Sequence, residues 1–328
     1  MSRLAPVIEG FFTTRLAQRR ATPATVAAYR DTFRLLLDFA AKRTGSPPSE
    51  LDVAEIDADL VGAYLEHLEV DRANSIRTRN LRLTAIHSLF SYAALRCPEH
   101  SETVRRVLAI PAKRADTTLV SFLTAVETDA LLSVIDRDSP LGERDHLFIV
   151  VAIQTGLRVS ELTALVFADI TYGTGAHLRT HGKGRKDRIT PLTRQTARLI
   201  HDYQQHRQAR PEQQVFANRF GGRLSTDAVK DMLDKHVRAA ADICPSLAVK
   251  TVTPHTLRHT CAMNMLQAGI DITTIALWLG HASTKATQVY LHADLTLKQQ
   301  ALARTAPTPI ARKRYRPPDT LLAFLEAL

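Results

Sequence analysis

The sequence contains 328 residues, of which 45% are hydrophobic and 23% charged, values typical of a globular protein with a full core. Its longest apolar run, Leu147–Ile153, is far shorter than the ~20 residues of a membrane-spanning helix, so no membrane partner is expected. Lys and Arg outnumber Asp and Glu by 43 to 33, and this net charge of +10 favours a polyanionic partner such as nucleic acid.

Residues 1–110 predict a helical domain. Residues 1–30 are Arg-rich and acid-poor, as transit peptides are, but we interpret them as an ordinary helix pair. Thr22 and Pro23 form a cap with proline at the first helical position, and apolar residues then recur at helical spacing. Further helices are expected at 58–68, 75–95 and 101–109. Residues 111–118 lack apolar periodicity and predict a linker.

Residues 119–304 predict a second domain with both helices and strands. Thr124 and Glu127 have the spacing of a capping box, and Gly156 is expected to end a helix over 144–154. Short β-like runs separated by glycines predict a small antiparallel sheet made of Val166–Ile170, Ala176–Thr180 and Asp187–Thr190. The remaining helices are expected at 193–208, 225–241, 254–268, 272–279 and 284–290.

Residues 305–328 form a basic, Pro-rich tail that ends in an apolar face made of Leu321, Leu322, Phe324, Leu325 and Leu328. A helix of about ten residues is marginal alone in water, so we expect it to dock. Its own domain and a neighbouring subunit are both open as the docking surface.

The cysteines Cys97, Cys244 and Cys261 are scattered, and no two of them form a CxxC pair. This pattern argues against a disulfide framework and predicts a reducing, cytoplasmic environment.

Two segments suit the binding of a phosphate. His255 and Arg258 are three residues apart, so they share one face of a predicted helix that starts at Thr253 and Pro254. Free backbone N–H groups and the helix dipole favour an anion at such a start. Arg158 follows Gly156 at another expected helix start, and two arginines on one phosphate would form permanently charged, bidentate clamps.

Three further residues complete a site for phosphodiester transesterification. Lys183 lies between two glycines of a predicted hairpin tip, where it could protonate a departing 5′-oxygen. His281 follows a Leu-Gly pair, and Tyr290 lies nine residues later as a candidate nucleophile. A covalent phosphotyrosine would conserve the energy of the broken bond, so no cofactor is expected.

Two alternative sites, a zinc site and a P-loop, each lack a residue that they require. His255 and His259 have the spacing of a helical zinc pair, but Thr256 replaces the glutamate of an HExxH motif and no third ligand follows at a telling distance. We therefore expect no metal site. The Gly-rich turn around Lys183 lacks the Ser or Thr that follows the lysine of a P-loop.

The order Arg, Lys, His-x-x-Arg, His, Tyr resembles the tyrosine recombinase family, which includes phage integrases and Xer-like site-specific recombinases. The resemblance covers residues 119–300 through these motifs and 1–110 through a four-helix pattern. It implies a mainly α fold with a small antiparallel sheet, in which an N-terminal helical core-binding (SAM-like) domain precedes an α+β catalytic domain. The two domains would clamp duplex DNA.

The resemblance also implies residue roles. Tyr290 would form a 3′-phosphotyrosine bond and Lys183 would be the general acid. The phosphorane would be stabilised by Arg158, Arg258 and His281. His255 would position the phosphate or help take the tyrosine proton, and Glu161 would brace the first arginine. The residues expected to contact DNA are Arg77, Arg79, Arg82, Lys186 and Arg188.

Family members act as tetramers on paired DNA sites, so a homo-tetramer is expected, with an accessory protein or second recombinase left open. The function implied is an ATP-independent site-specific recombinase for integration, excision, transposition or dimer resolution. Two alternatives remain: a type IB topoisomerase-like or resolving activity, and a DNA-binding accessory protein without catalysis.

Overall fold

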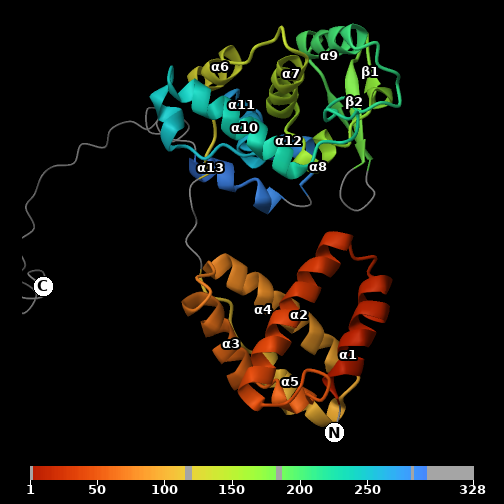
Figure 1. Ribbon diagram of the computed structural model, residues 1–328, viewed down its shortest axis with the longest axis vertical. Helices are drawn as coiled ribbons and strands as arrows, with labels where there is room; N and C mark the ends of the chain where they lie inside the picture. The colour runs from red at the N-terminus through yellow and green to blue at the C-terminus, as the bar shows by residue number, and fades with distance from the viewer. Residues whose placement is uncertain (1–2, 115–119, 182–186, 282–283, 294–328) are drawn as a thin grey trace, which may run out of the picture. The chain divides into compact units, whose positions relative to one another are not determined.

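The computed structural model describes residues 3–114, 120–181, 187–281 and 284–293 (Figure 1). The chain divides into two compact units, Met1–Thr117 and Thr118–Leu328. The first is helical, and the second combines helices with one three-stranded sheet, so the predicted fold class is confirmed. The expected tail at 305–328 lies outside the described residues. Within the described ranges, none of the helices has the length and apolar character needed to cross a membrane.

Over residues 3–114, the first unit contains five α-helices: α1 (Leu4–Gly10), α2 (Pro23–Thr44), α3 (Ala58–Val70), α4 (Ile76–Ala93) and α5 (Ser101–Leu108). The start of α2 is as predicted, because Thr22 Oγ1 accepts a hydrogen bond from the Thr25 amide at 3.2 Å. Phe11 is fully buried and lies in ring contact with Phe12, Tyr29, Phe33 and Tyr92. This aromatic cluster forms part of the unit's own core.

The structure changes the interpretation of Arg79, which we expected on a DNA-facing polar side of α4. Arg79 is only 6% exposed, and its guanidinium donates a hydrogen bond to the Pro111 carbonyl and lies 3.4 Å from Glu69. The side chain is therefore committed inside the unit, because the segment after α5 returns across α4. Arg77 is exposed and Arg82 half-buried, and their role at DNA stays a prediction.

The second unit contains eight α-helices within the described ranges: α6 (Ala125–Ser133), α7 (Pro140–Thr155), α8 (Val159–Leu162), α9 (Arg194–His206), α10 (Thr226–Ala241), α11 (Pro254–Gln267), α12 (Ile272–Leu279) and α13 (Val289–Ala293). The predicted capping box of α6 is present, with Glu127 Oε2 accepting from the Thr124 amide at 2.8 Å. Helix α7 starts four residues before the expected Arg144, because Ser139 caps it. It packs against α9 and α11.

The sheet has the order β1 (Ile170–Thr171), β2 (His177–His181), β3 (Asp187–Pro191), and both pairings are antiparallel. Buried Leu178 lies opposite Ile170 on one side and Thr190 on the other.

Two expected elements differ in the structure. The expected strand at Val166–Ile170 is mostly a 3₁₀ turn, because the Asp169 carboxylate accepts from the Val166 amide at 3.2 Å and folds the chain back. The expected helix over 284–290 is instead a 3₁₀ turn at Thr284–Ala286, followed by α13.

Candidate active site

Arg258 joins the ends of two helices to a third. It projects from α11 and is 4% exposed, with Nη1 donating to the Gly156 carbonyl at 2.5 Å and Nη2 donating to the Leu279 carbonyl at 2.7 Å. Gly156 is the residue after α7, and Leu279 is the last residue of α12. A buried guanidinium aligned by two carbonyls keeps a fixed position, as a phosphate clamp requires.

Arg158 is the residue before the short helix α8, so it lies at a helix start as predicted. Its Nη1 donates to Glu161 Oε1 at 3.0 Å, and its Nη2 donates to the Gly280 carbonyl at 3.3 Å. Glu161 also accepts from the Arg158 backbone amide at 2.8 Å. The expected bracing of Arg158 by Glu161 is thus seen in its geometry, and the Arg158 side chain remains 32% exposed.

Arg188 reaches the same cluster from β3. Its Nη2 donates to Glu161 Oε2 at 2.7 Å, and its Nη1 donates to the Leu279 carbonyl. We expected Arg188 to hold a flanking phosphate, but the structure gives it these partners within the protein, since its long side chain extends from β3 to Glu161 and to the end of α12. Lys183 and Lys186, between β2 and β3, lie outside the described residues.

The electrostatics of this cluster favour an anion. Burial first, and then the charges of Arg158 and Arg188, lower the pKa of Arg258 to about 10, while Glu161 opposes that shift. Burial and Arg158 likewise lower the pKa of Arg188. Three guanidinium groups therefore repel one another around Glu161, and a phosphate would relieve that repulsion.

His281 follows α12 and Gly280, as the Leu-Gly-His motif implied. Its Nδ1 lies 2.7 Å from Thr287 Oγ1, a buried hydroxyl just before α13. Burial, together with the charges of Arg258, Arg158 and Arg188, lowers the pKa of His281 to about 4. The imidazole is neutral at pH 7 and can donate one N–H to an anion.

Tyr290 lies on α13 and is 1% exposed, packed with α11 and α12 residues such as Met263 and Leu279. Its hydroxyl lies 2.9 Å from Nδ1 of His259. Burial raises the pKa of Tyr290, while Arg258 opposes that shift. The His255 side chain is exposed, and its ring centre lies 6.3 Å from that of His259.

Sequence reasoning missed three residues that the structure places at this site. We weighed His259 only as a zinc ligand, although its position one residue after Arg258 directs it to the same region. Thr287 carried no motif. Trp278 was also unassigned, and its indole Nε1 donates to the Thr155 carbonyl at 3.0 Å, tying α12 to the end of α7. Burial raises the pKa of the neighbouring Cys261 to about 12, so this thiol is not a nucleophile at pH 7.

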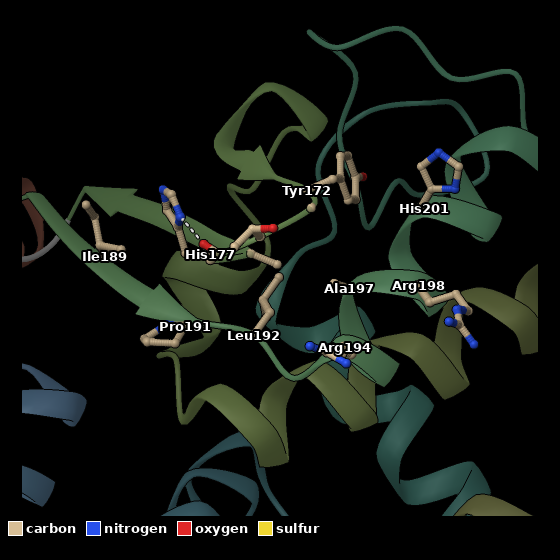
Figure 2. Close-up of a pocket in the computed structure, with 13 residues that line it drawn as sticks. Tyr172, His177, Ile189, Pro191, Leu192, Arg194, Ala197, Arg198 and His201 are labelled. Carbon is tan, nitrogen blue, oxygen red and sulfur yellow. Dashed lines mark hydrogen bonds between the residues drawn. The ribbon is translucent and has the colours of Figure 1, made fainter.

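The sheet and α9 enclose a separate groove of about 800 Å³ (Figure 2). Tyr172, His177 and Leu192 line it together with Arg194 and Arg198. Among the described residues, none of the predicted catalytic side chains lines this groove, and we assign it no part in the site. Across the described ranges, no three or more His, Cys, Asp or Glu side chains come together as a metal site would require.

Comparison with known proteins identifies the family. Residues 121–296 match the phage integrase family, and residues 8–96 match the N-terminal SAM-like domain of phage integrases. A protein named integrase/recombinase y4rC from Sinorhizobium fredii (strain NBRC 101917 / NGR234) is 52% identical over 99% of this chain and 98% of its own. The tyrosine recombinase XerC of Pelobacter propionicus (strain DSM 2379 / NBRC 103807 / OttBd1) is 32% identical over 93% of this chain and 97% of its own.

Solved structures show the same fold. The Tn1549 transposon integrase, in complex with circular intermediate DNA, matches 93% of this chain and 100% of its own with a TM-score of 0.67 at 16% identity. A lambda integrase dimer bound to a COC' core site matches 93% of this chain and 79% of its own with a TM-score of 0.66 at 18% identity. The predicted family is confirmed: the chain belongs to the phage integrase family of tyrosine recombinases.

Proposed function

We propose that the chain is a site-specific DNA recombinase that cuts and rejoins duplex DNA through a 3′-phosphotyrosine intermediate. The observation that carries the proposal is that Arg158 and Arg258 donate hydrogen bonds to the carbonyls of Gly156, Leu279 and Gly280, the last two of which directly precede His281. These contacts hold two permanent cations beside a neutral imidazole, an arrangement that suits a single phosphate.

The proposed chemistry follows from these groups. The Tyr290 phenolic oxygen attacks the scissile phosphorus, and the bond from phosphorus to the 5′-oxygen breaks. Arg158, Arg258 and His281 donate hydrogen bonds to the phosphorane as it gains negative charge, and a preorganised donor of this kind contributes about 3–4 kcal/mol. Lys183 protonates the departing 5′-oxygen. The phosphotyrosine keeps the energy of the broken bond, so the partner strand's 5′-hydroxyl reverses the step without a nucleotide.

The substrates proposed are two paired double-stranded DNA sites, held by a homo-tetramer. Arg77, Arg82 and Lys186 would contact the DNA backbone and position the duplex. The apolar face at 321–328 would link neighbouring subunits, so deleting residues 319–328 would spare DNA binding by one subunit and weaken assembly on paired sites. Sedimentation with paired sites would measure the difference. The setting proposed is the cytoplasm, with integration, excision, transposition or dimer resolution as the task.

Covalent trapping tests the proposal. A library of duplexes with a randomised core carries a nick just past each candidate phosphate, so the short released end diffuses away and the adduct persists. The wild-type chain should give a shifted band on a denaturing gel, and Tyr290→Phe should give none while binding duplex normally. Sequencing the shifted DNA yields the site. An adduct formed by Tyr290→Phe would refute the proposal, and relaxation of supercoils by a lone subunit would favour a topoisomerase-like activity.

A further inference from the structure

The nucleophile proposed here has a direct hydrogen-bond partner. Tyr290 Oη lies 2.9 Å from His259 Nδ1, and the two rings meet edge to face with centres 5.5 Å apart. Because Tyr290 is 1% exposed, water does not compete for this contact. Among the residues that the structure describes, His259 is the hydrogen-bond partner of the Tyr290 hydroxyl.

The geometry distinguishes His259 from His255, which by the family resemblance would position the phosphate or help take the tyrosine proton. Both project from α11, one turn apart, but His255 is exposed, and its ring centre lies 6.3 Å from that of His259. The hydrogen bond of the Tyr290 hydroxyl is to His259. A general base must lie within hydrogen-bond reach of the proton that it takes, and His259 meets that condition.

The surroundings keep His259 in its neutral form, the form that can accept a proton. Burial, and then the charges of His255 and Arg258 on its own helix, lower the pKa of His259 to about 4. His259 in turn contributes to the lowered pKa of the neighbouring His281, which belongs to the segment after α12. The ring is therefore neutral at pH 7, and with its proton on Nε2 its Nδ1 has a free lone pair aimed at Tyr290. A bound DNA phosphate would favour the protonated ring, because opposite charges attract.

We propose that His259 is the general base that takes the phenolic proton of Tyr290 during strand cleavage. This role rests on the proposed function. As Tyr290 Oη bonds to phosphorus, its proton moves to His259 Nδ1, the bond from phosphorus to O5′ breaks, and O5′ takes a proton from Lys183. On rejoining, the 5′-hydroxyl gives its proton to Lys183 and attacks phosphorus, and the Tyr290 oxygen recovers its proton from His259. Protons and electron pairs balance over the cycle.

Single-turnover cleavage of the nicked duplex recovered in the trapping experiment tests this role. His259→Ala should form the adduct about 10²–10⁴-fold more slowly, the usual contribution of a general base. His259→Asn keeps a hydrogen-bond acceptor near the Nδ1 position but cannot carry the proton, so it should stay slow. Restoration of the wild-type rate by asparagine would overturn the proposal in favour of mere orientation of Tyr290. His201→Ala, an exposed histidine of α9, should cleave at the wild-type rate.

A substrate with sulfur in place of the bridging 5′-oxygen separates the two proton transfers. The thiolate leaves without a general acid, so Lys183→Ala should recover on this substrate while His259→Ala remains slow. Recovery of both variants would place His259 at the leaving group and overturn the assignment. Tyr290→Phe must form no adduct on either substrate; if it does, the proposed function fails, whereas a fast His259→Ala contradicts only the role of His259.

A measurement without DNA addresses the same role. Nitrogen-15 chemical shifts of the histidine rings at pH 7 report which nitrogen carries the proton, and the His259→Asn spectrum assigns the signals. We expect His259 to be protonated on Nε2 alone. A proton on Nδ1 would make the ring a donor to Tyr290 and would overturn the proposal.

Discussion

Arg188 and Arg258 donate hydrogen bonds to the same backbone oxygen, that of Leu279. One arginine comes from β3 and the other from α11, and the shared carbonyl is at the C-terminal end of α12, where the helix dipole favours cations. His281 follows two residues later. A single oxygen atom therefore holds a strand, two helices and the histidine segment in register, so the position of each cation depends on the others.

Replacing Glu161 by Gln should disturb this register without changing its volume. The carboxylate binds both Arg158 and Arg188, and its loss leaves three guanidinium groups without that counter-charge. Cleavage should slow about 10–100-fold, since small misplacements of catalytic groups have effects of this order. Single-turnover adduct formation measures it. Glu102→Gln, which removes an exposed carboxylate paired with Arg105, is the control, and equal rates for both variants would contradict the argument.

A methyl group at Gly156 should act on the site through packing. The residue has φ +63°, and a Cβ there would lie 2.6 Å from Leu279 Cδ2 and 3.0 Å from Cys261 Sγ. We expect Gly156→Ala to lower the free energy of unfolding by about 2–4 kcal/mol, from overpacking and backbone strain together. Gly173 has φ +87° but open space around a Cβ, so Gly173→Ala should lower the free energy of unfolding by only about 1–2 kcal/mol, from backbone strain alone. Urea denaturation compares the two, and equal losses would exclude the packing contribution.

The ion pair between Lys250 and Glu127 should be important for stability. Burial alone would raise the pKa of Glu127, but hydrogen bonds from Lys250 and Ser246 lower this pKa to about 2. Lys250→Met leaves a buried carboxylate unpaired and should lower the free energy of unfolding by about 3 kcal/mol. Lys230→Met, which breaks an exposed pair with Asp234, should change it by less than about 0.5 kcal/mol.

The pH dependence of this pair has a definite sign. Because the pKa of Glu127 is lower in the folded state than its usual 4.5, its contribution is complete above about pH 4.5 and is lost as the pH falls toward 2. In Lys250→Met the pKa of Glu127 should lie nearer to 4.5 or above it, so the loss of stability below pH 4.5 should be smaller than in the wild type or absent. Denaturation series at several pH values measure both effects, and superimposable curves would contradict the ion-pair account.

Two histidines should make the fold acid-sensitive in a different range. Burial and nearby cations lower the pKa values of His259 and His281 from 6.5 to about 4. Below pH 6.5 the unfolded chain takes up these protons first, so the free energy of unfolding should fall between pH 6.5 and 4. The double variant with Asn at both positions should lose less over that interval. Parallel losses in the variant and the wild type would show that these rings do not cause the slope.

Local signals in the sequence predicted much of this structure. The cap at Thr22, the box of Thr124 and Glu127, and the stop at Gly156 depend on atoms within four residues of one another, so a short stretch of sequence contains the whole interaction. Arg158 was likewise predicted at a helix start and Arg258 in the first turns of a helix, and the structure has both positions as predicted.

What the sequence did not reveal depends on distant partners. Arg79 is buried because the Pro111 carbonyl, 32 residues later, covers it, and no periodicity on α4 reports that contact. Arg188 pairs with Glu161, 27 residues before it, because the position of β3 brings the two side chains together. His259 contacts Tyr290, which lies 31 residues later in the chain. In the sequence, its distance of four residues from His255 instead resembled the spacing of a helical zinc pair. Polar contacts between separate elements arise from packing, which a one-dimensional pattern does not encode.

The indole bond from Trp278 to the Thr155 carbonyl makes the site optically visible. The chain contains one tryptophan, so nearly all of its emission on excitation at long wavelength comes from this ring. Thr155 precedes Gly156, whose carbonyl holds Arg258, and Trp278 precedes Leu279, whose carbonyl holds Arg188 and Arg258. A shift in emission on adding DNA would therefore report movement where α12 meets the end of α7, next to the carbonyls that align the arginines. The measurement needs no label and follows the change in real time.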